Sequence, residues 1–249
     1  MRGREVRADE LLFRPPKDYN EVIKNIYGYL YNWYAVTDAR RIANYGWRVP
    51  NRNDWISLIM LMNPNSHWNG NGWTKLENPQ IFGLREEPQR HPRWDLGYTK
   101  GNNFFRLSLY PCSYRKKDGN FPELNDNEYL GKMGHIWTYS LGIQPHEGVL
   151  IKYTKNFIGV FGDPIKGYTD KRIGAGVRVV RNLMSEENTL KDGSFVDNYV
   201  GNNGMVYRAV KINNLVWITN NLIETKFRNN DDIPMIEDNI EWSEQNIII

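Results

Sequence analysis

The stretch YNWYAVTDARRIANYGWRVPNRNDW, residues 31–55, decides the fold that we expect for this chain. Residues 27–36 form an aromatic and β-branched run, which favours a strand. A short connection over residues 38–50 follows it. Gly46 and Pro50 close this connection because neither residue suits the interior of a helix or of a central strand. The stretch therefore predicts a strand and a loop in front of a helix.

The helix itself is expected over residues 51–62, which carry the clearest helical pattern in the chain. Asn51 or Asn53 can cap its first turn, and Pro64 ends it. Its apolar face consists of Trp55, Leu58, Ile59 and Met62.

Later segments read as strands separated by glycine-rich turns. Residues 104–121 predict a hairpin with its turn at 117–120, where Gly119 supplies the positive φ. A second hairpin is predicted over 204–222, with an Asn213-Asn214 turn. Three further strands are expected at 135–142, 148–162 and 174–182, as in an antiparallel meander. The overall prediction is an α+β fold.

The composition excludes several classes of protein. The net charge is only +3, and phosphate backbones are bound by clustered Lys and Arg, so nucleic acid is not expected as a partner. A single cysteine rules out an internal disulfide and a multi-cysteine metal site. No window has the roughly 18–20 apolar residues of a membrane span. The aromatic share of 13% suits a core of loops and short strands, and it also suits a recognition surface.

Several segments resemble, in the same order, the FISUMP family (the Fibrobacter succinogenes major paralogous domain). They are YNWYAV (31–36), GWRVP (46–50), NDW (53–55), LREEPQRHPRW (84–94), SYRKKDGNF (113–121), HIWTYS (135–140) and GAGVRVVRN (174–182). The resemblance implies a fold like that of C-type lectins and formylglycine-generating enzymes. Such a fold has small twisted antiparallel sheets, one or two short helices and long ordered loops. Related modules occur in Bacteroidetes surface proteins and in phage fibre proteins.

One segment stands in a different place from its counterpart in the family. VYRAVKINNLVWITNNLIETKFRNNDDIP (206–234) resembles a segment that precedes YNWYA there, whereas here it follows the core, 27–182. Either the module is circularly permuted, or 204–249 begins a second module. We expect 204–249 to complete the sheet of the core, within the chain or by exchange between subunits. Residues 183–203 are interpreted as the linker that permits this.

Catalysis is not expected. Formylglycine-type oxidation uses two cysteines, and this chain has only Cys112, which we interpret as a half-buried structural thiol. Calcium-dependent sugar binding would require a carboxylate where Gln144-Pro145 is followed by His146. The four histidines lack the spacing of a zinc site. The sequence thus predicts no catalytic residue, no metal and no cofactor.

The resemblance places the ligand face on the strands and loops near the end of the module. The candidate ligand-binding residues are Trp137, Tyr139, Tyr153, Asn156, Phe157 and Tyr168. Aromatic rings stack on sugars, and Asn satisfies hydroxyl groups. The alternative interpretation is that Trp137, Tyr139 and Phe157 belong to the core.

The function that we expect is that of a non-enzymatic phage virion component, a tail or head fibre or receptor-binding protein that recognises a bacterial surface glycan or protein. Residues 1–26 would be an arm that docks onto other virion proteins by strand addition. No apolar leader is visible at the N-terminus, which favours a virion part made in the host cytoplasm. A homo-oligomer is expected, with a trimer as one option. The alternatives are a purely structural decoration or fibre anchor, and an adhesin on the bacterial cell surface.

Overall fold

The structure is a computed structural model that describes residues 27–62, 103–122, 131–141, 148–154, 158–161 and 169–244. Two small antiparallel sheets form its framework. The three-stranded sheet consists of β1 (Met133–Leu141), β2 (Gly148–Thr154) and β3 (Ile158–Phe161), in that order. The four-stranded sheet has the order β4-β7-β6-β5, with β4 Val180–Asn182, β7 Leu215–Ile218, β6 Val206–Ile212 and β5 Ser194–Val200.

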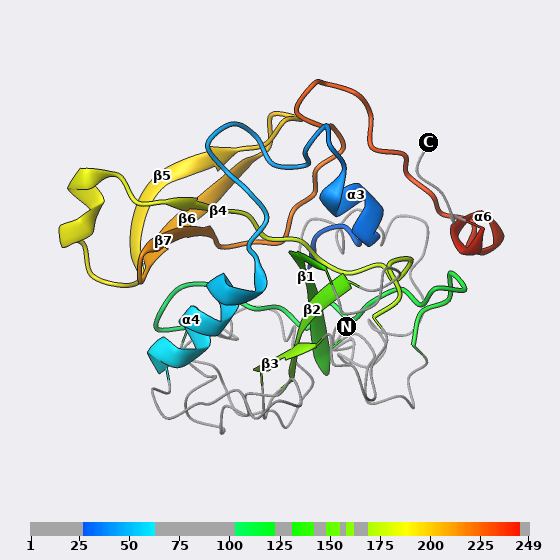
Figure 1. The fold of residues 1–249 in the computed structure, drawn as a ribbon, viewed down its shortest axis with the longest axis horizontal. Helices are drawn as coiled ribbons and strands as arrows, with labels where there is room; N and C mark the ends of the chain where they lie inside the picture. Colours follow the sequence, from blue (N-terminus) through cyan, green and yellow to red (C-terminus); the bar gives the residue numbers. More distant parts are fainter. Residues whose placement is uncertain are drawn as a thin grey trace, which may run out of the picture.

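Short helices surround the two sheets (Figure 1). They are α3 (Trp33–Thr37), α4 (Arg52–Met62), the 3-10 helix η1 (Ser185–Thr189) and α6 (Asn239–Ser243). None of the helices in the described ranges combines the length and the apolar character that a membrane span requires. The mixture of short helices and small antiparallel sheets confirms the predicted α+β class.

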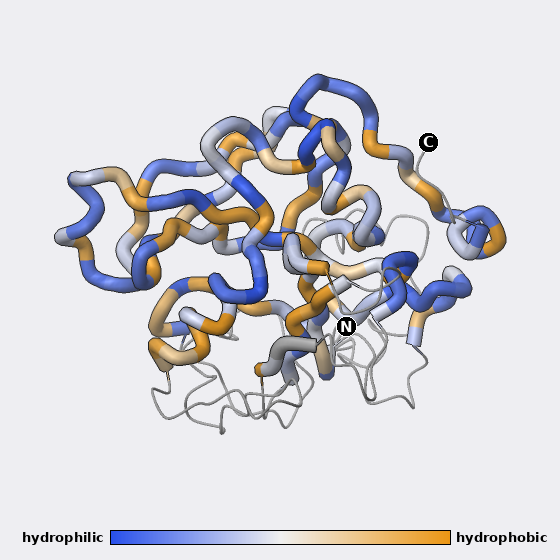
Figure 2. Tube along the Cα trace, in the orientation of Figure 1, coloured by the Kyte–Doolittle hydropathy of each residue, from blue (hydrophilic) through white to orange (hydrophobic). Residues whose placement is uncertain are grey.

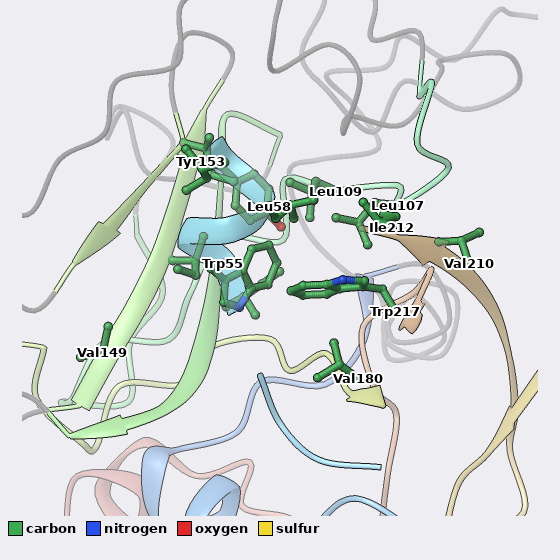
Figure 3. Close-up of a cluster of buried hydrophobic side chains, with 14 residues drawn as sticks. Trp55, Leu58, Leu107, Leu109, Val149, Tyr153, Val180, Val210, Ile212 and Trp217 are labelled. Carbon is green, nitrogen blue, oxygen red and sulfur yellow. The ribbon is translucent and has the colours of Figure 1, made fainter. Parts of the chain in front are cut away.

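Helix α4 packs on both sheets, as its apolar face predicts. It begins where expected, because the Asn51 side chain accepts the Asp54 N–H at 3.0 Å and Asp54 accepts the Asn51 N–H at 2.6 Å. This reciprocal pairing is a capping box. Trp55 meets Trp217 of β7 with ring centroids 4.8 Å apart in an edge-to-face arrangement (Figure 3). One buried cluster therefore contains residues of α4 and of both sheets. In Figure 2 the outer turns are mostly hydrophilic, which agrees with this central core.

A single crossing segment, residues 174–182, connects the two sheets. Gly176 bridges to Ile136 of β1, and four residues later Val180 starts β4, which pairs with β7. Gly176 is required at the crossing because an added Cβ would lie 2.9 Å from the Asn221 amide nitrogen. The crossing segment thus sets how the two sheets lie relative to each other.

Arg178, in the middle of the crossing segment, is fully buried. Its guanidinium donates to the carbonyl oxygens of Leu107 (2.9 Å), Ser108 (2.7 Å) and Ile218 (2.9 Å), and to the Asn221 side-chain oxygen (2.6 Å). These acceptors come from two segments that lie more than a hundred residues apart in the chain, the 103–110 loop and the end of β7 with the residues that follow it. A buried charge is tolerated only when its donors are satisfied, as they are here.

The C-terminal segment is held in a similar way by Arg115. The Arg115 guanidinium donates to the carbonyl oxygens of Ile236 (2.6 Å) and Glu237 (2.9 Å), among other acceptors in this segment. Its Cζ lies 4.3 Å from the centroid of the Trp242 ring in α6. Asp238 caps α6 by accepting the N–H groups of Ile240 and Glu241. Residues 236–242 are therefore anchored to the core.

Two predicted strands are wrong in detail. Residues 33–37 form helix α3, because the Asn32 side chain accepts the Ala35 N–H at 2.9 Å and caps a turn that the aromatic run does not suggest. In 104–121 the turn at Gly119 is confirmed, with φ +85°. The Lys116 N–H donates to the Asn120 carbonyl at 2.8 Å, but the pairing goes no further. The flank before the turn bridges to Gly134 and Gly174 through Ser113 and Arg115 instead, so the expected hairpin does not form.

Two other strand predictions need revision. The segment 148–162 forms two strands, β2 and β3, which pair with each other rather than running as one. In 174–182 only β4 is regular strand, because the rest of this segment crosses between the sheets.

The second half of the chain completes the framework. The predicted hairpin 204–222 is confirmed as β6 and β7, with Asn213 at φ 52° in its turn. It joins β4 in the same chain. Residues 183–203, interpreted as a linker, contain η1 and β5, and β5 is an edge strand of the sheet. The exposure of β5 conceals it, because only one of its residues, Tyr199, is buried.

Replacing Arg178 with Met should destabilise the protein by about 3 kcal/mol or more, since each buried acceptor left without a donor costs about 1–3 kcal/mol. Urea unfolding measures the change. The control is Arg172→Met, which removes a partly exposed pair with Asp170 and should cost less than about 1 kcal/mol. If the two variants lose the same free energy of unfolding, the buried hydrogen bonds of Arg178 stabilise the protein no more than a partly exposed ion pair does.

A chain that ends at Asn182 should not fold to the native state. It lacks β7, the partner of β4, and Trp217, the partner of Trp55. We expect aggregation, or a melting temperature lower by at least about 10 °C. Size-exclusion chromatography and thermal denaturation measure this. A shortened chain that is monomeric, soluble and as heat-stable as the full chain would refute the structural role of 204–244.

Candidate ligand-binding surface

The loop from Asp38 to Arg48, between α3 and α4, is fixed in place by Arg228 from the far end of the chain. The Arg228 N–H donates to the Arg41 carbonyl at 2.9 Å. Its guanidinium donates to the Ala43 carbonyl through two nitrogens, at 3.0 Å and 2.8 Å. A loop held by backbone and side-chain bonds of this kind presents its side chains in a defined geometry.

Tyr45 projects from this loop with 77% of its surface exposed. The Arg228 guanidinium lies 4.7 Å from the centroid of its ring. Arginine stacked on an aromatic face is attracted by the ring quadrupole, so the tyrosine is both exposed and oriented. Gly46 follows with φ +77° and gives the loop its sharp bend.

Tyr139 of β1 reaches the same loop from the other side. It is 42% exposed, and its hydroxyl accepts from the Arg41 guanidinium at 2.6 Å. The Tyr139 N–H donates to the Pro50 carbonyl at 2.8 Å, which draws this end of β1 toward the loop. The four side chains of Arg41, Tyr45, Tyr139 and Arg228 are called the tyrosine–arginine surface below.

The charge of this surface is positive. Arg40 is neutralised by Asp38 at 2.9 Å and Asp231 at 3.3 Å. The hydrogen bond from Arg40 lowers the pKa of Asp38, and a hydrogen bond from a neighbouring asparagine, with help from Arg40, lowers the pKa of Asp231. Within the described ranges no carboxylate lies within ion-pair distance of Arg41 or Arg228. The surface can therefore attract an acidic or strongly polar ligand.

Two residues predicted to face a ligand lie in the core instead. Trp137 is fully buried, and its indole N–H donates to the Tyr31 carbonyl at 2.8 Å. Tyr153 is also fully buried, and its hydroxyl donates to the Tyr110 carbonyl at 2.7 Å. Neither ring can face a ligand in this structure, and for Trp137 the alternative interpretation as a core residue agrees with it.

Among the described residues that we predicted to face a ligand, Tyr139 is exposed. It is two positions from Trp137, and regular strand geometry would place both on one face. The pairing of β1 with β2 is irregular between Trp137 and Leu141, which separates the two side chains. Asn156, Phe157 and Tyr168 lie outside the described residues.

The other members of the surface, Arg41, Tyr45 and Arg228, were not predicted. An exposed aromatic beside a turn glycine, as in Asn44-Tyr45-Gly46, is the local signal that could have indicated Tyr45. Arg228 lies 185 residues after Ala43, whose carbonyl it binds, and no local pattern indicates such a contact.

The comparison with protein families gives a match to the Fibrobacter succinogenes major domain, over residues 12–181. That range is more than half of the chain. The chain belongs to the Fibrobacter succinogenes major domain family. Neither curated proteins nor solved structures gave a significant match.

The Fibrobacter succinogenes major domain match ends at Arg181, within β4. The loop that carries Arg41 and Tyr45, and Tyr139, fall inside the matched range, whereas Arg228 falls outside it. The surface thus combines residues of the matched domain with one from the segment that follows. The resemblance of that segment to the opening of the family stays a prediction.

The thiol of Cys112 lies beneath the domain surface. It is buried, with Sγ 3.7 Å from the His135 carbonyl, and burial raises its pKa. A thiol with a raised pKa carries little thiolate at neutral pH and is a poor nucleophile. No group of three or more His, Cys, Asp or Glu side chains in the described ranges could hold a metal ion.

Proposed function

We propose that the chain is a non-enzymatic recognition protein that binds a bacterial surface ligand, most simply a glycan, as a component of a phage particle. The observation that carries the proposal is the tyrosine–arginine surface, in which two exposed aromatic rings are each oriented by an arginine. Tyrosine provides a large flat contact area at low entropic cost, and arginine binds hydroxyl, carboxylate or phosphate groups. This combination is suited to gripping a polar, ring-shaped ligand.

The finer fold that we propose is a C-type-lectin-like module. The two small antiparallel sheets, the short helices and the long connections between them support it. In such a module function lies in loops held on a rigid framework, which is the arrangement of the Asp38–Arg48 loop. The location in a virion rests on the resemblance to modules of phage fibres. The docking arm, residues 1–26, lies outside the described residues.

A glycan array probed with the labelled full chain tests ligand recognition. We expect binding to one class of bacterial surface polysaccharide. The double substitution Tyr45→Ala and Tyr139→Ala should weaken binding at least about tenfold, or about 1.4 kcal/mol, because exposed aromatic anchors dominate such contacts. Both side chains project from the surface, so the melting temperature should change little.

Phe195→Ala is the matched control for the array. Phe195 is also exposed and also flanked by two arginines, Arg106 at 4.9 Å and Arg208 at 5.5 Å from its ring centroid, but it lies on β5. Binding should be unchanged in this variant. Equal losses in the double variant and in the control, or no glycan bound by the unmodified chain, would count against the tyrosine–arginine surface.

Mass spectrometry of purified phage particles tests the location. Peptides of this chain in the particles support a virion component. A chain that is present in the particles but binds neither glycans nor intact cells fits the alternative of a structural decoration. A chain found on the bacterial surface and not in particles fits an adhesin.

A further inference from the structure

A second candidate site lies on the other side of the segment that begins α4. It is a pocket of about 250 Å³ between α4, the end of β4 and the turn that joins β6 to β7. We call it the α4 pocket. Its volume corresponds to about eight water molecules at about 30 Å³ each, which is smaller than the pockets of about 300–1,000 Å³ that take drug-sized ligands. The α4 pocket therefore suits a ligand of roughly one sugar ring.

The rim of the α4 pocket carries polar side chains that can form hydrogen bonds with a ligand. Ser57 of α4, Asn182 of β4 and Asn214 of the hairpin turn line it. Hydroxyl and amide side chains each offer both a donor and an acceptor. Within the described part of the chain these three side chains make no hydrogen bond, although they converge on one pocket from three elements. Such groups can bond the hydroxyls of a ligand, which are likewise both donors and acceptors.

The charges at the pocket cancel each other. Arg48 and Asp54 face each other in a two-pronged pair, with nitrogen–oxygen distances of 2.5 Å and 3.0 Å. Asp54 also accepts the Asn51 N–H, so its carboxylate is occupied by the helix cap. An anion would gain little from a guanidinium that is already paired in this way. The α4 pocket therefore favours a neutral ligand, in contrast to the tyrosine–arginine surface.

Leu58, Ile212 and Trp217, from α4, β6 and β7, lie beneath the pocket (Figure 3). Each of them is only 1% exposed and belongs to the central cluster, so the base of the pocket is rigid and closed. A ligand therefore makes its main contacts with the polar rim.

We propose that the α4 pocket binds a neutral sugar ring, a hexopyranose unit. It is distinct from the tyrosine–arginine surface and does not depend on it, since the two share no side chain. Ser57, Asn182 and Asn214 bond the hydroxyls of the ring. The pocket is small, so a single ring should bind weakly, with a Kd of roughly 1–10 mM.

Saturation-transfer NMR on the full chain tests the proposal. The probes are the methyl glycosides of glucose, galactose, mannose and N-acetylglucosamine, with glucuronate and inorganic phosphate as charged comparisons. We expect transfer to at least one neutral glycoside. Ser57→Leu should reduce it at least about fivefold, because leucine fills the pocket and suits an exposed helix position. The melting temperature should be unchanged, which separates a filled pocket from a misfolded protein.

Asn198→Leu, on the exposed face of β5, is the control and should leave the signal intact. Transfer to no neutral glycoside, transfer to the charged probes alone, or a signal that survives Ser57→Leu would each overturn the proposal. The double variant of Tyr45 and Tyr139 should still bind the glycoside. If the unmodified chain bound no glycan on the array but still bound the glycoside, the first proposal would be refuted without touching this one.

Discussion

The guanidinium of Arg178 joins three segments of the chain at one buried point. Four hydrogen bonds reach from it to Leu107, Ser108, Ile218 and Asn221, and all four acceptors are neutral oxygens. Removing a guanidinium from water is costly, and these bonds offset the cost only if every one is made. The arrangement is therefore cooperative. It holds the 103–110 loop, the crossing segment and the end of β7 against one another.

This cooperativity explains how a chain with so little regular structure keeps a defined surface. The strands of the four-stranded sheet are at most seven residues long, and β4 has only three. Such strands are weak alone, and their stability comes from side-chain packing across elements. The Trp55–Trp217 contact and the two arginine anchors, Arg178 and Arg115, supply that packing at the points where sheets, loops and tail meet. A rigid interior of this kind lets the sequence of the outer loops vary while their orientation is kept.

The parts that sequence reasoning predicted are those in which local signals and packing agree. Helix α4 has a capping box and one apolar face, and the β6–β7 hairpin has strict alternation and an Asn-Asn turn. The failures arise where a distant or single contact overrides the local pattern. Asn32 caps a helix in a run with strand propensity, and the mostly exposed strand β5 is fixed by pairing with β6 rather than by burial. The candidate site shows the same division. Tyr139 was predicted, while Arg228 enters the surface through contacts that only the folded chain makes.

The two candidate sites differ in charge because of how one short segment is built. Residues 48–52 run between the two sites and contact both of them. Arg48 is paired with Asp54 at the α4 pocket, while the Pro50 carbonyl and the Arg52 N–H bind Tyr139 and Ser140 of β1. The Asp54 carboxylate caps α4 and also neutralises Arg48, so the α4 pocket carries no net charge from this pair. Arg41, on the other side, has a tyrosine hydroxyl for its partner and keeps its charge. The position of one carboxylate at the start of α4 therefore decides which of the two sites is neutral and which is positive.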